Sequence, residues 1–235
     1  DLAWSRGLGD VYKRQGISCL KFGIQSSFET RMRLHIKLLG FILAVLVNLS
    51  WAEVTPTLNS DAIKATFGSY GVDVINQSES TRVANLYSLS GDAKICRTLA
   101  VTEFVLPTDP ALTEAHRLIR AGGSIGATLR SAGFTINKKL LIKTETVAGD
   151  EFVSLTHGSV LLGAPLYTKV YALFAQQDGL QIPYAVIAEA YHPEHFPPAH
   201  EEFSEQPSLQ QAADRALMTL RATIDQGQIK RSPAA

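Results

Sequence analysis

Hydrophobic residues recur along the chain in short segments, and their spacing changes from every second residue to every third or fourth. The first spacing is typical of strands and the second of helices. β-Branched and aromatic residues predict strands over residues 72–75 and 81–88, and a longer strand over 95–106. A turn at 90–92 joins the last two strands, and the prolines within 107–110 end the third. This part of the pattern is therefore that of a β-hairpin with one further strand.

Helical spacing predicts four helices, one before the strands, two between them and one after them. They are expected over residues 60–67, 111–120, 124–132, and from 208 to the glycine at 227. The last of them carries the most regular apolar stripe, and it opens on Ser208 and Gln211, which fit a capping box.

The carboxyl-terminal half supplies more extended segments. Residues 134–147 are expected to form a long strand, and 160–162 a weaker apolar segment. Residues 167–176 and 180–191 flank Asp178-Gly179, which is a strong hairpin signal. The Pro-, His- and Glu-rich stretch after residue 191 predicts a loop. Together the segments indicate an α+β fold, in which helices flank an antiparallel sheet.

Two of the predicted hairpins resemble each other. Residues 92–107 (DAKICRTLAVTEFVLP) align without gaps with residues 178–193 (DGLQIPYAVIAEAYHP), 86 positions later. The alignment pairs Glu103 with Glu189, and each of them stands four residues before a proline. We expect two related hairpins that pair into one antiparallel sheet.

The amino-terminal part consists of three layers that precede the predicted domain. Residues 1–15 resemble a translated sequencing adaptor, and we expect all of 1–31 to be foreign or upstream sequence. From Met32, a basic start precedes an apolar run at 38–49, and small residues flank a possible cleavage site after Ala52. This is the pattern of a secretory signal peptide.

The apolar run is also too short for a membrane anchor, which needs about 20 residues. We therefore expect residues 32–52 to be removed and residues 53–235 to form one domain. The mature protein is expected to be periplasmic or secreted and to have no membrane partner after cleavage.

The charge of the chain depends on this leader. All 235 residues together hold 22 basic and 22 acidic side chains, whereas residues 53–235 hold 15 basic and 19 acidic ones, a net charge of −4. An acidic domain argues against a nucleic-acid partner, and its single cysteine, Cys96, excludes an internal disulfide. A hydrophobic content of 46% excludes a disordered chain. The lysines at 138, 139 and 143 are expected on a solvated strand edge.

Glu189 stands between two alanines in a strongly apolar predicted strand. A carboxylate in an apolar setting costs free energy unless it is paired or hydrogen-bonded, and perturbed buried carboxylates concentrate in functional sites. Two interpretations follow: an edge position that faces water, or a group that handles a ligand or a proton on the concave face of the sheet.

The motifs together resemble chorismate lyase, whose fold also serves as the ligand-sensing domain of GntR-type regulators. The matching pieces lie within residues 81–196. They are Asp92-Ala93, Val105-Leu106-Pro107, Ile125-Gly126-Ala127-Thr128-Leu129 and Ala188-Glu189-Ala190-Tyr191-His192-Pro193. The resemblance implies a chorismate lyase-like α+β fold with a pocket between the sheet and the helices.

The resemblance also implies roles for single residues. The glutamate of the family's last hairpin, which contacts the substrate hydroxyl, corresponds to Glu189, the candidate catalytic residue. The family's two arginines fall near Asn85, three residues from Arg82, and on Glu103. We take as candidate substrate-binding residues Arg82, Arg97, Glu103 and Tyr184.

The loop after residue 191 also carries candidate metal ligands. Its histidines are His192, His195 and His200. Imidazoles three residues apart can share a zinc or copper ion, but the spacing matches no established motif, and a solvated, pH-sensitive loop explains it as well. We predict no metal, and no cofactor either, because the glycines at 122–126 lack a P-loop lysine.

Three functions remain open at this point. The leading hypothesis is an exported protein that binds a small molecule, with Glu189 in the pocket; the resemblance points to a small aromatic or cyclic acid. The first alternative is a lyase that releases pyruvate from a chorismate-like substrate, with Arg82 or Arg97 in place of the family's arginines. The second is an envelope interaction protein without a pocket, which docks through its last helix. Glu189 on an open, convex face would favour this last alternative.

Overall fold

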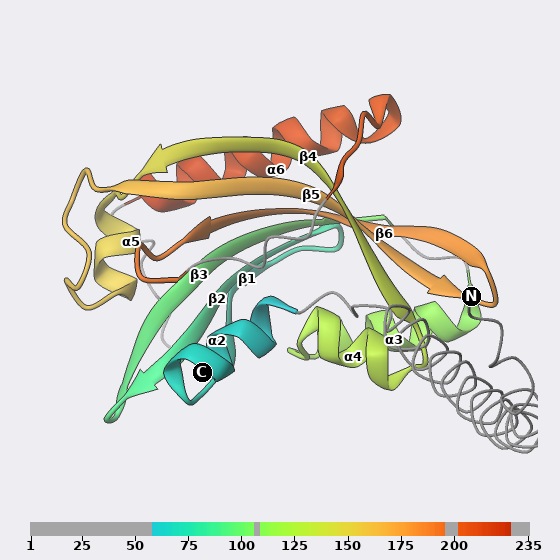
Figure 1. Ribbon diagram of the computed structural model, residues 1–235, viewed down its shortest axis with the longest axis horizontal. Helices are drawn as coiled ribbons and strands as arrows, with labels where there is room; N and C mark the ends of the chain where they lie inside the picture. The colour runs from blue at the N-terminus through green and yellow to red at the C-terminus, as the bar shows by residue number, and fades with distance from the viewer. Residues whose placement is uncertain (1–57, 106–108, 196–201, 227–235) are drawn as a thin grey trace, which may run out of the picture. The chain divides into compact units, whose positions relative to one another are not determined.

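One seven-stranded sheet organises the computed structural model, which describes residues 58–105, 109–195 and 202–226. These residues belong to the unit Pro56–Ala235. The strand order is β1-β2-β3-β6-β5-β4-β7 (Figure 1). All pairs are antiparallel except the short contact of β7 with β4. The strands are β1 (Gly71–Gln77), β2 (Thr81–Ser90), β3 (Ala93–Phe104), β4 (Thr135–Val147), β5 (Pro165–Gln177), β6 (Leu180–Tyr191) and β7 (Glu202–Phe203).

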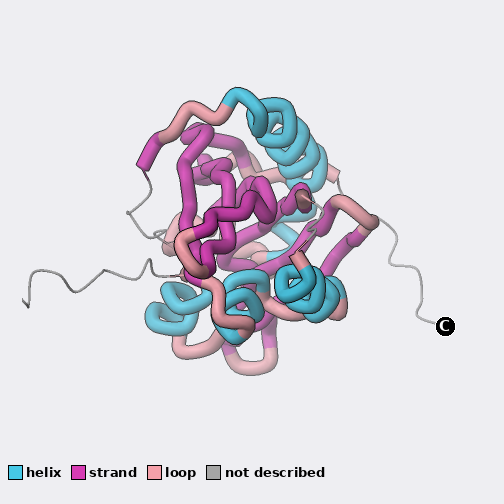
Figure 2. The backbone as a smooth tube through the Cα atoms, turned by 90° about the vertical axis from the view of Figure 1, so that its right-hand side faces the viewer, coloured by secondary structure: helices cyan, strands magenta, loops and turns pink. Residues whose placement is uncertain are grey.

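Helices cover both faces of this sheet (Figures 1 and 2). The long helix α6 (Pro207–Asp225) lies across one face, and the short helix α5 (Asp150–Leu155) packs beside it. The opposite face is covered by α2 (Asn59–Phe67), α3 (Pro110–Arg120) and α4 (Ile125–Ser131). The α+β class with an antiparallel sheet and flanking helices, expected from the sequence, is confirmed.

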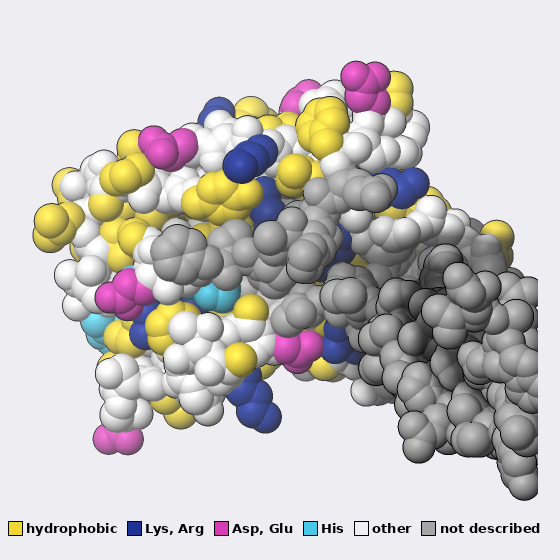
Figure 3. Space-filling model, in the orientation of Figure 1, with side chains coloured by type: hydrophobic (Ala, Val, Ile, Leu, Met, Phe, Trp, Pro, Cys, Tyr) yellow, Lys and Arg dark blue, Asp and Glu magenta, His cyan; other side chains and the backbone are white. Residues whose placement is uncertain are grey.

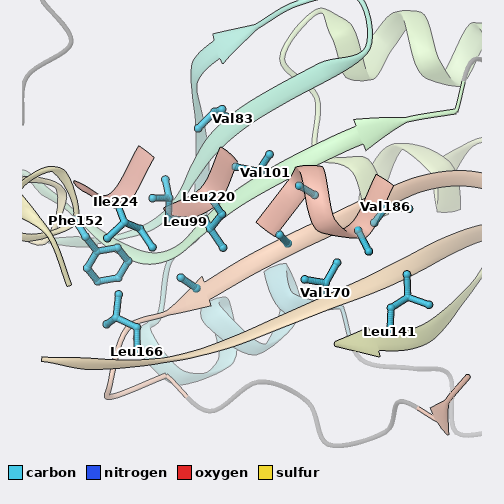
Figure 4. Close-up of a cluster of buried hydrophobic side chains, with 14 of the residues drawn as sticks. Val83, Leu99, Val101, Leu141, Phe152, Leu166, Val170, Val186, Leu220 and Ile224 are labelled. Atoms are coloured by element: carbon cyan, nitrogen blue, oxygen red, sulfur yellow. The ribbon is translucent and has the colours of Figure 1, made fainter. Parts of the chain in front are cut away.

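The face under α6 holds the larger apolar core. Val101, Val170 and Val186 project from neighbouring strands toward Leu220 and Ile224 of the helix (Figure 4). Side chains alternate between the two faces of a strand, so the next residue of each strand points the other way. We call that other side the cavity face, because it faces α2 and α4 and is packed less completely.

Most predicted elements lie where the sequence placed them, with four differences. The segment at 160–162 is not a strand, while α5 and the two-residue β7 were missed. The capping box was wrong: α6 begins at Pro207, and no side chain caps it. Proline is favoured at a first helical position, because its missing N–H has no partner there in any helix.

The two hairpins pair side by side through β3 and β6, as expected, but one position away from the sequence alignment. The turn at Gly91-Asp92 corresponds to Asp178-Gly179, which is 87 positions later. Each second strand contains one extra residue that bulges out of the ladder, Arg97 in β3 and Tyr184 in β6, and these also differ by 87.

The offset of 87 residues corresponds to a local twofold symmetry of the two hairpins. The β3–β6 ladder runs from Thr98–Tyr191 to Phe104–Ala185, and its middle pair is Val101–Ala188. A local twofold axis through that pair exchanges the hairpins and keeps each face of the sheet on its own side. A shift of one residue moves a side chain to the opposite face of a strand. Glu103 and Glu189, which the sequence alignment equated, therefore lie on opposite faces.

Candidate ligand-binding site

A cavity of about 70 Å³ lies between the cavity face of the sheet and the starts of α2 and α4. One water molecule needs roughly 10–15 Å³ by the same kind of measure, so there is room for several waters or one small organic molecule. Most of the wall is apolar. Its polar side chains are Asn59, Ser60, Tyr70, Arg82, Thr102, Ser124, Lys138 and Glu189.

Glu189 lies in this wall, and only 3% of its surface is exposed. Its Oε2 accepts a hydrogen bond from the Tyr191 hydroxyl, and its Oε1 accepts one from Asn59 Nδ2 at 3.3 Å. Both partners donate, which is the arrangement that suits a carboxylate. The edge position that faces water, one of the two interpretations of Glu189, is therefore wrong for this residue.

Asn59, the first residue of α2, connects Glu189 to the turn that follows β6. Its Nδ2 also donates to Thr98 Oγ1 at 3.1 Å, and its Oδ1 lies 2.6 Å from Nε2 of His195. An amide oxygen can only accept, so Nε2 of His195 carries the proton. Burial lowers the pKa of His195 to about 4, so the ring is neutral at pH 7. Its Nδ1 is buried and has no hydrogen-bond partner in the described part of the chain.

Arg82, on β2, lines the same cavity and is 2% exposed. One guanidinium nitrogen, Nη1, donates to the carbonyl oxygens of Ile119 at 3.2 Å and Gly123 at 2.8 Å, at the end of α3. Its Nε is buried without a partner, and the described residues place no carboxylate within ion-pair distance. Burial lowers the pKa of Arg82, but a guanidinium remains charged in proteins. The cavity wall therefore contains a cation without an acidic neighbour among the described residues.

Two lysines that the sequence analysis did not assign to the site lie on the same face. Lys169, on β5, is 2% exposed and stands directly across the β5–β6 ladder from Glu189. Its Nζ lies 5.4 Å from the ring centres of both Tyr171 and Tyr191. Lys138 lines the cavity with its Nζ 4.7 Å from the Tyr171 ring. The expected solvated lysine edge was therefore wrong for Lys138, which is half-buried. It stands opposite Leu173 in the β4–β5 ladder and so points to the same face as this cavity-lining residue.

Three of the residues predicted to bind the substrate lie outside the cavity wall. Arg97 stacks on the Phe67 ring at 3.7 Å and donates to Ser88 and Glu194, so it fastens the end of α2. The reason is the β-bulge, which turns Arg97 out of the ladder and toward α2.

Glu103 and Tyr184 are the other two. Glu103 lies on the α6 face, 3.6 Å from Arg215 of that helix, because it is an odd number of residues from the cavity-lining Thr102. The Tyr184 hydroxyl is 3.0 Å from Nδ1 of His116, and its ring packs against Phe104. Of the five predicted residues, the cavity brings together Glu189 and Arg82.

Ser159, His192 and Glu194 resemble a hydrolytic triad in composition but not in hydrogen bonding. Ser159 Oγ lies 3.1 Å from Nε2 of His192, and it donates its own proton to the Thr156 carbonyl. The backbone N–H of Glu194 donates to Nδ1 of His192, so the ring proton resides on Nε2. A protonated Nε2 cannot accept the serine proton, and this arrangement therefore does not activate a nucleophile.

The loop histidines do not form a metal centre within the described residues. No group of three or more His, Cys, Asp or Glu side chains that could hold an ion occurs there. His192 and His195 are separately hydrogen-bonded, and His200 lies outside the described residues. Within the same residues, no helix is long and apolar enough to cross a membrane. Basic and acidic side chains are interspersed over the face shown in Figure 3.

Comparison with known proteins yields likeness in structure only. No family model matches the sequence, and no curated protein matches it. The ligand-binding domain of a GntR-family transcriptional regulator from Bordetella bronchiseptica is 16% identical; 58% of this chain and 92% of that chain are covered, at a TM-score of 0.35. A GntR-family regulator from Enterococcus faecalis V583 is 12% identical, with 59% and 96% covered, at a TM-score of 0.32.

A regulator from Escherichia coli CFT073 is 11% identical, with 55% of this chain and 94% of that chain covered, at a TM-score of 0.35. At such identities the likeness concerns the fold alone.

Proposed function

We propose that this domain binds a small organic acid in the cavity between the sheet and α2. The observation that carries the proposal is the buried Arg82 guanidinium, which lines the cavity without an acidic partner among the described residues. A buried charge is costly unless it is paired, and a guanidinium matches the planar fork of a carboxylate. A ligand carboxylate at Arg82 would supply the missing counter-charge.

Glu189 supports a second contact with the same ligand. It belongs to β6, two strands from Arg82 in β2, and two strand spacings separate the two backbones by about 10 Å across the sheet. A single ring that carries a carboxylate fits between two side chains that start so far apart. Because Glu189 is held by donors, it would accept a hydrogen bond from a hydroxyl group at the other end of the ligand.

The two alternative functions have less support. A lyase with Arg97 as a substituted cation would need that residue in the cavity, and Arg97 is instead held by Phe67, Ser88 and Glu194. An interaction protein without a pocket would fit an open, convex Glu189, and this residue is buried in a cavity wall. Binding of a small acid accounts for the buried Arg82, which an interaction protein without a pocket does not require. A lyase that used Arg82 would bind its acidic substrate at the same cation, so the pyruvate assay described below distinguishes it from simple binding.

Calorimetric titration with benzoate and with benzamide tests the proposal, because the two have the same shape and differ in charge. We expect benzoate to bind at least ten times more tightly, and Arg82→Gln to remove the difference. Arg97→Gln is the matched control, because it removes a second buried arginine outside the cavity. Equal affinity of the wild-type protein for both compounds would overturn the proposal. Pyruvate release from chorismate, assayed on the same samples, would revive the lyase alternative.

We also propose that residues 32–52 direct export of the protein. The basic start, the apolar run and the small residues before position 53 support this. Expression of residues 32–235 in a bacterial host, followed by fractionation and mass spectrometry, is expected to give a periplasmic or secreted protein that begins at Glu53. An intact, cytoplasmic product would contradict the proposal, and Leu46→Arg, which interrupts the apolar run with a charge, is expected to produce that result.

A further inference from the structure

The local twofold axis gives each half of the sheet one buried cation at the same place. Arg82 in β2 and Lys169 in β5 differ by 87 positions, the offset that relates the two hairpins. Both are 2% exposed, and both point to the cavity face. The residues that stand across the ladder from them, Thr102 and Glu189, also differ by 87.

The two halves differ in what faces the cation. In the second hairpin, Lys169 stands opposite a carboxylate, Glu189. In the first, Arg82 stands opposite the neutral Thr102. Residues directly opposite each other in an antiparallel pair have Cβ atoms about 5 Å apart, and opposite charges attract at that distance. Lys169 therefore has a carboxylate opposite it within the sheet, whereas the described neighbours of Arg82 offer it carbonyl oxygens and no carboxylate.

Resting on the proposed binding function, we propose that the residue across the ladder decides which cation serves the ligand. Thr102 carries no charge, so Arg82 stays available to the anionic group of a ligand. Glu189 neutralises Lys169 and offers the ligand a hydrogen-bond acceptor. The cavity is then specific for a ligand with one anionic group and, at its other end, a neutral donor group. Thr102 and Lys169 are specificity-determining residues that no motif of the sequence indicated.

Exchanging the two opposing residues tests this inference. Thr102→Glu places a carboxylate opposite Arg82, as Glu189 stands opposite Lys169 in the second hairpin. It should therefore neutralise Arg82 and weaken benzoate binding at least tenfold. Glu189→Thr copies the first half into the second, so it should release Lys169 for a second anion. The probes for this variant are terephthalate and its monoamide, which are alike in shape and differ by one negative charge.

We expect the wild-type protein to bind the monoamide at least as tightly as terephthalate, and Glu189→Thr to prefer terephthalate at least tenfold. Adding Lys169→Met to Glu189→Thr should abolish that preference. Glu103→Thr, which removes a carboxylate from the opposite face of the same sheet, is the matched control and should leave both affinities unchanged. Circular dichroism verifies folding, and Glu189→Gln replaces Glu189→Thr if the latter does not fold.

The outcomes separate the inference from the proposed function. If wild-type protein fails to prefer benzoate over benzamide, the binding function itself is wrong. If that preference holds while Thr102→Glu still binds benzoate normally, or if removal of the Glu189 carboxylate leaves the terephthalate-to-monoamide ratio unchanged, the inference is overturned and the function stands.

Discussion

At the scale of single residues, His195 shows how burial sets a protonation state. The ring is 3% exposed, and its Nε2 proton is donated to Asn59. A second proton on Nδ1 would find no acceptor among the described residues. Burial disfavours the charged ring most, the Glu189 carboxylate favours it, and the positive charges of Arg97 and Lys169 disfavour it. Desolvation is the largest of these effects, and it lowers the pKa of His195 from 6.5 to about 4.

This lowered pKa makes stability depend on pH. Above pH 6.5 the His195 ring is neutral in both the folded and the unfolded protein, so its titration takes nothing from the free energy of unfolding. As the pH falls from 6.5 toward 4, the unfolded chain takes up a proton that the folded chain does not, and stability is lost by up to about 3 kcal/mol. Urea unfolding at pH 7 and pH 4.5 is expected to show this loss in the wild-type protein and a smaller loss in His195→Gln. Parallel losses in the two proteins would contradict it; the exposed His157, replaced by Asn, serves as control.

Residue identity and apolar context were sufficient to single out Glu189, which the structure places in the cavity wall, whereas its role toward a ligand stays a prediction. They were not sufficient for Lys169, which looks like an ordinary lysine in the sequence. Its position depends on the hairpin register: the turn at Asp178-Gly179 alone would put Thr168 opposite Glu189. The bulge at Tyr184 shifts the ladder by one residue and brings Lys169 there instead.

At the scale of elements, β-bulges therefore determine the composition of the site. The bulge at Arg97 turns this side chain out of the ladder toward Phe67. The order and approximate limits of the long strands followed from periodicity and turn residues. The positions of the bulges could not be predicted in this way. A bulge depends on how two strands twist and pack together, and the sequence of one strand does not reveal this.

The two glutamates that the sequence alignment equated are expected to behave differently. Glu189 faces the cavity, whereas Glu103 contacts Arg215 of α6 at 3.6 Å. We expect 4-hydroxybenzoate to bind more tightly than benzoate, because its hydroxyl donates to Glu189, and Glu189→Gln to reduce that advantage about tenfold. Glu103→Gln should leave the advantage intact and change stability by less than about 1 kcal/mol, since its partner is half-exposed. Calorimetric titration of both variants with both acids measures this advantage. If Glu103→Gln lost the preference for 4-hydroxybenzoate, the placement of Glu103 and Glu189 on opposite faces of the sheet would be contradicted.

At the scale of the whole molecule, the two faces of the sheet differ in packing and in charge. The α6 face is filled by apolar side chains from β3, β5, β6, α5 and α6 (Figure 4). The cavity face contains buried charges and unfilled space. Because dense packing supplies most of the folding free energy and charged cavities supply little, stability and binding reside on opposite sides of one layer.

This division predicts that stability and affinity can be changed separately. Leu220 is fully buried under the sheet, so Leu220→Ala should lower the free energy of unfolding by about 2–5 kcal/mol and leave the benzoate affinity of the folded protein unchanged. Ala100 lines the cavity beside Glu189. Ala100→Leu adds three carbon atoms to open space, so it should weaken benzoate binding at least tenfold while stability changes by less than about 1.5 kcal/mol. Urea unfolding and calorimetry on the same preparations measure both quantities. A change in affinity with Leu220→Ala, or normal binding with Ala100→Leu, would mean that the ligand does not occupy this cavity or that the two faces are coupled through the sheet.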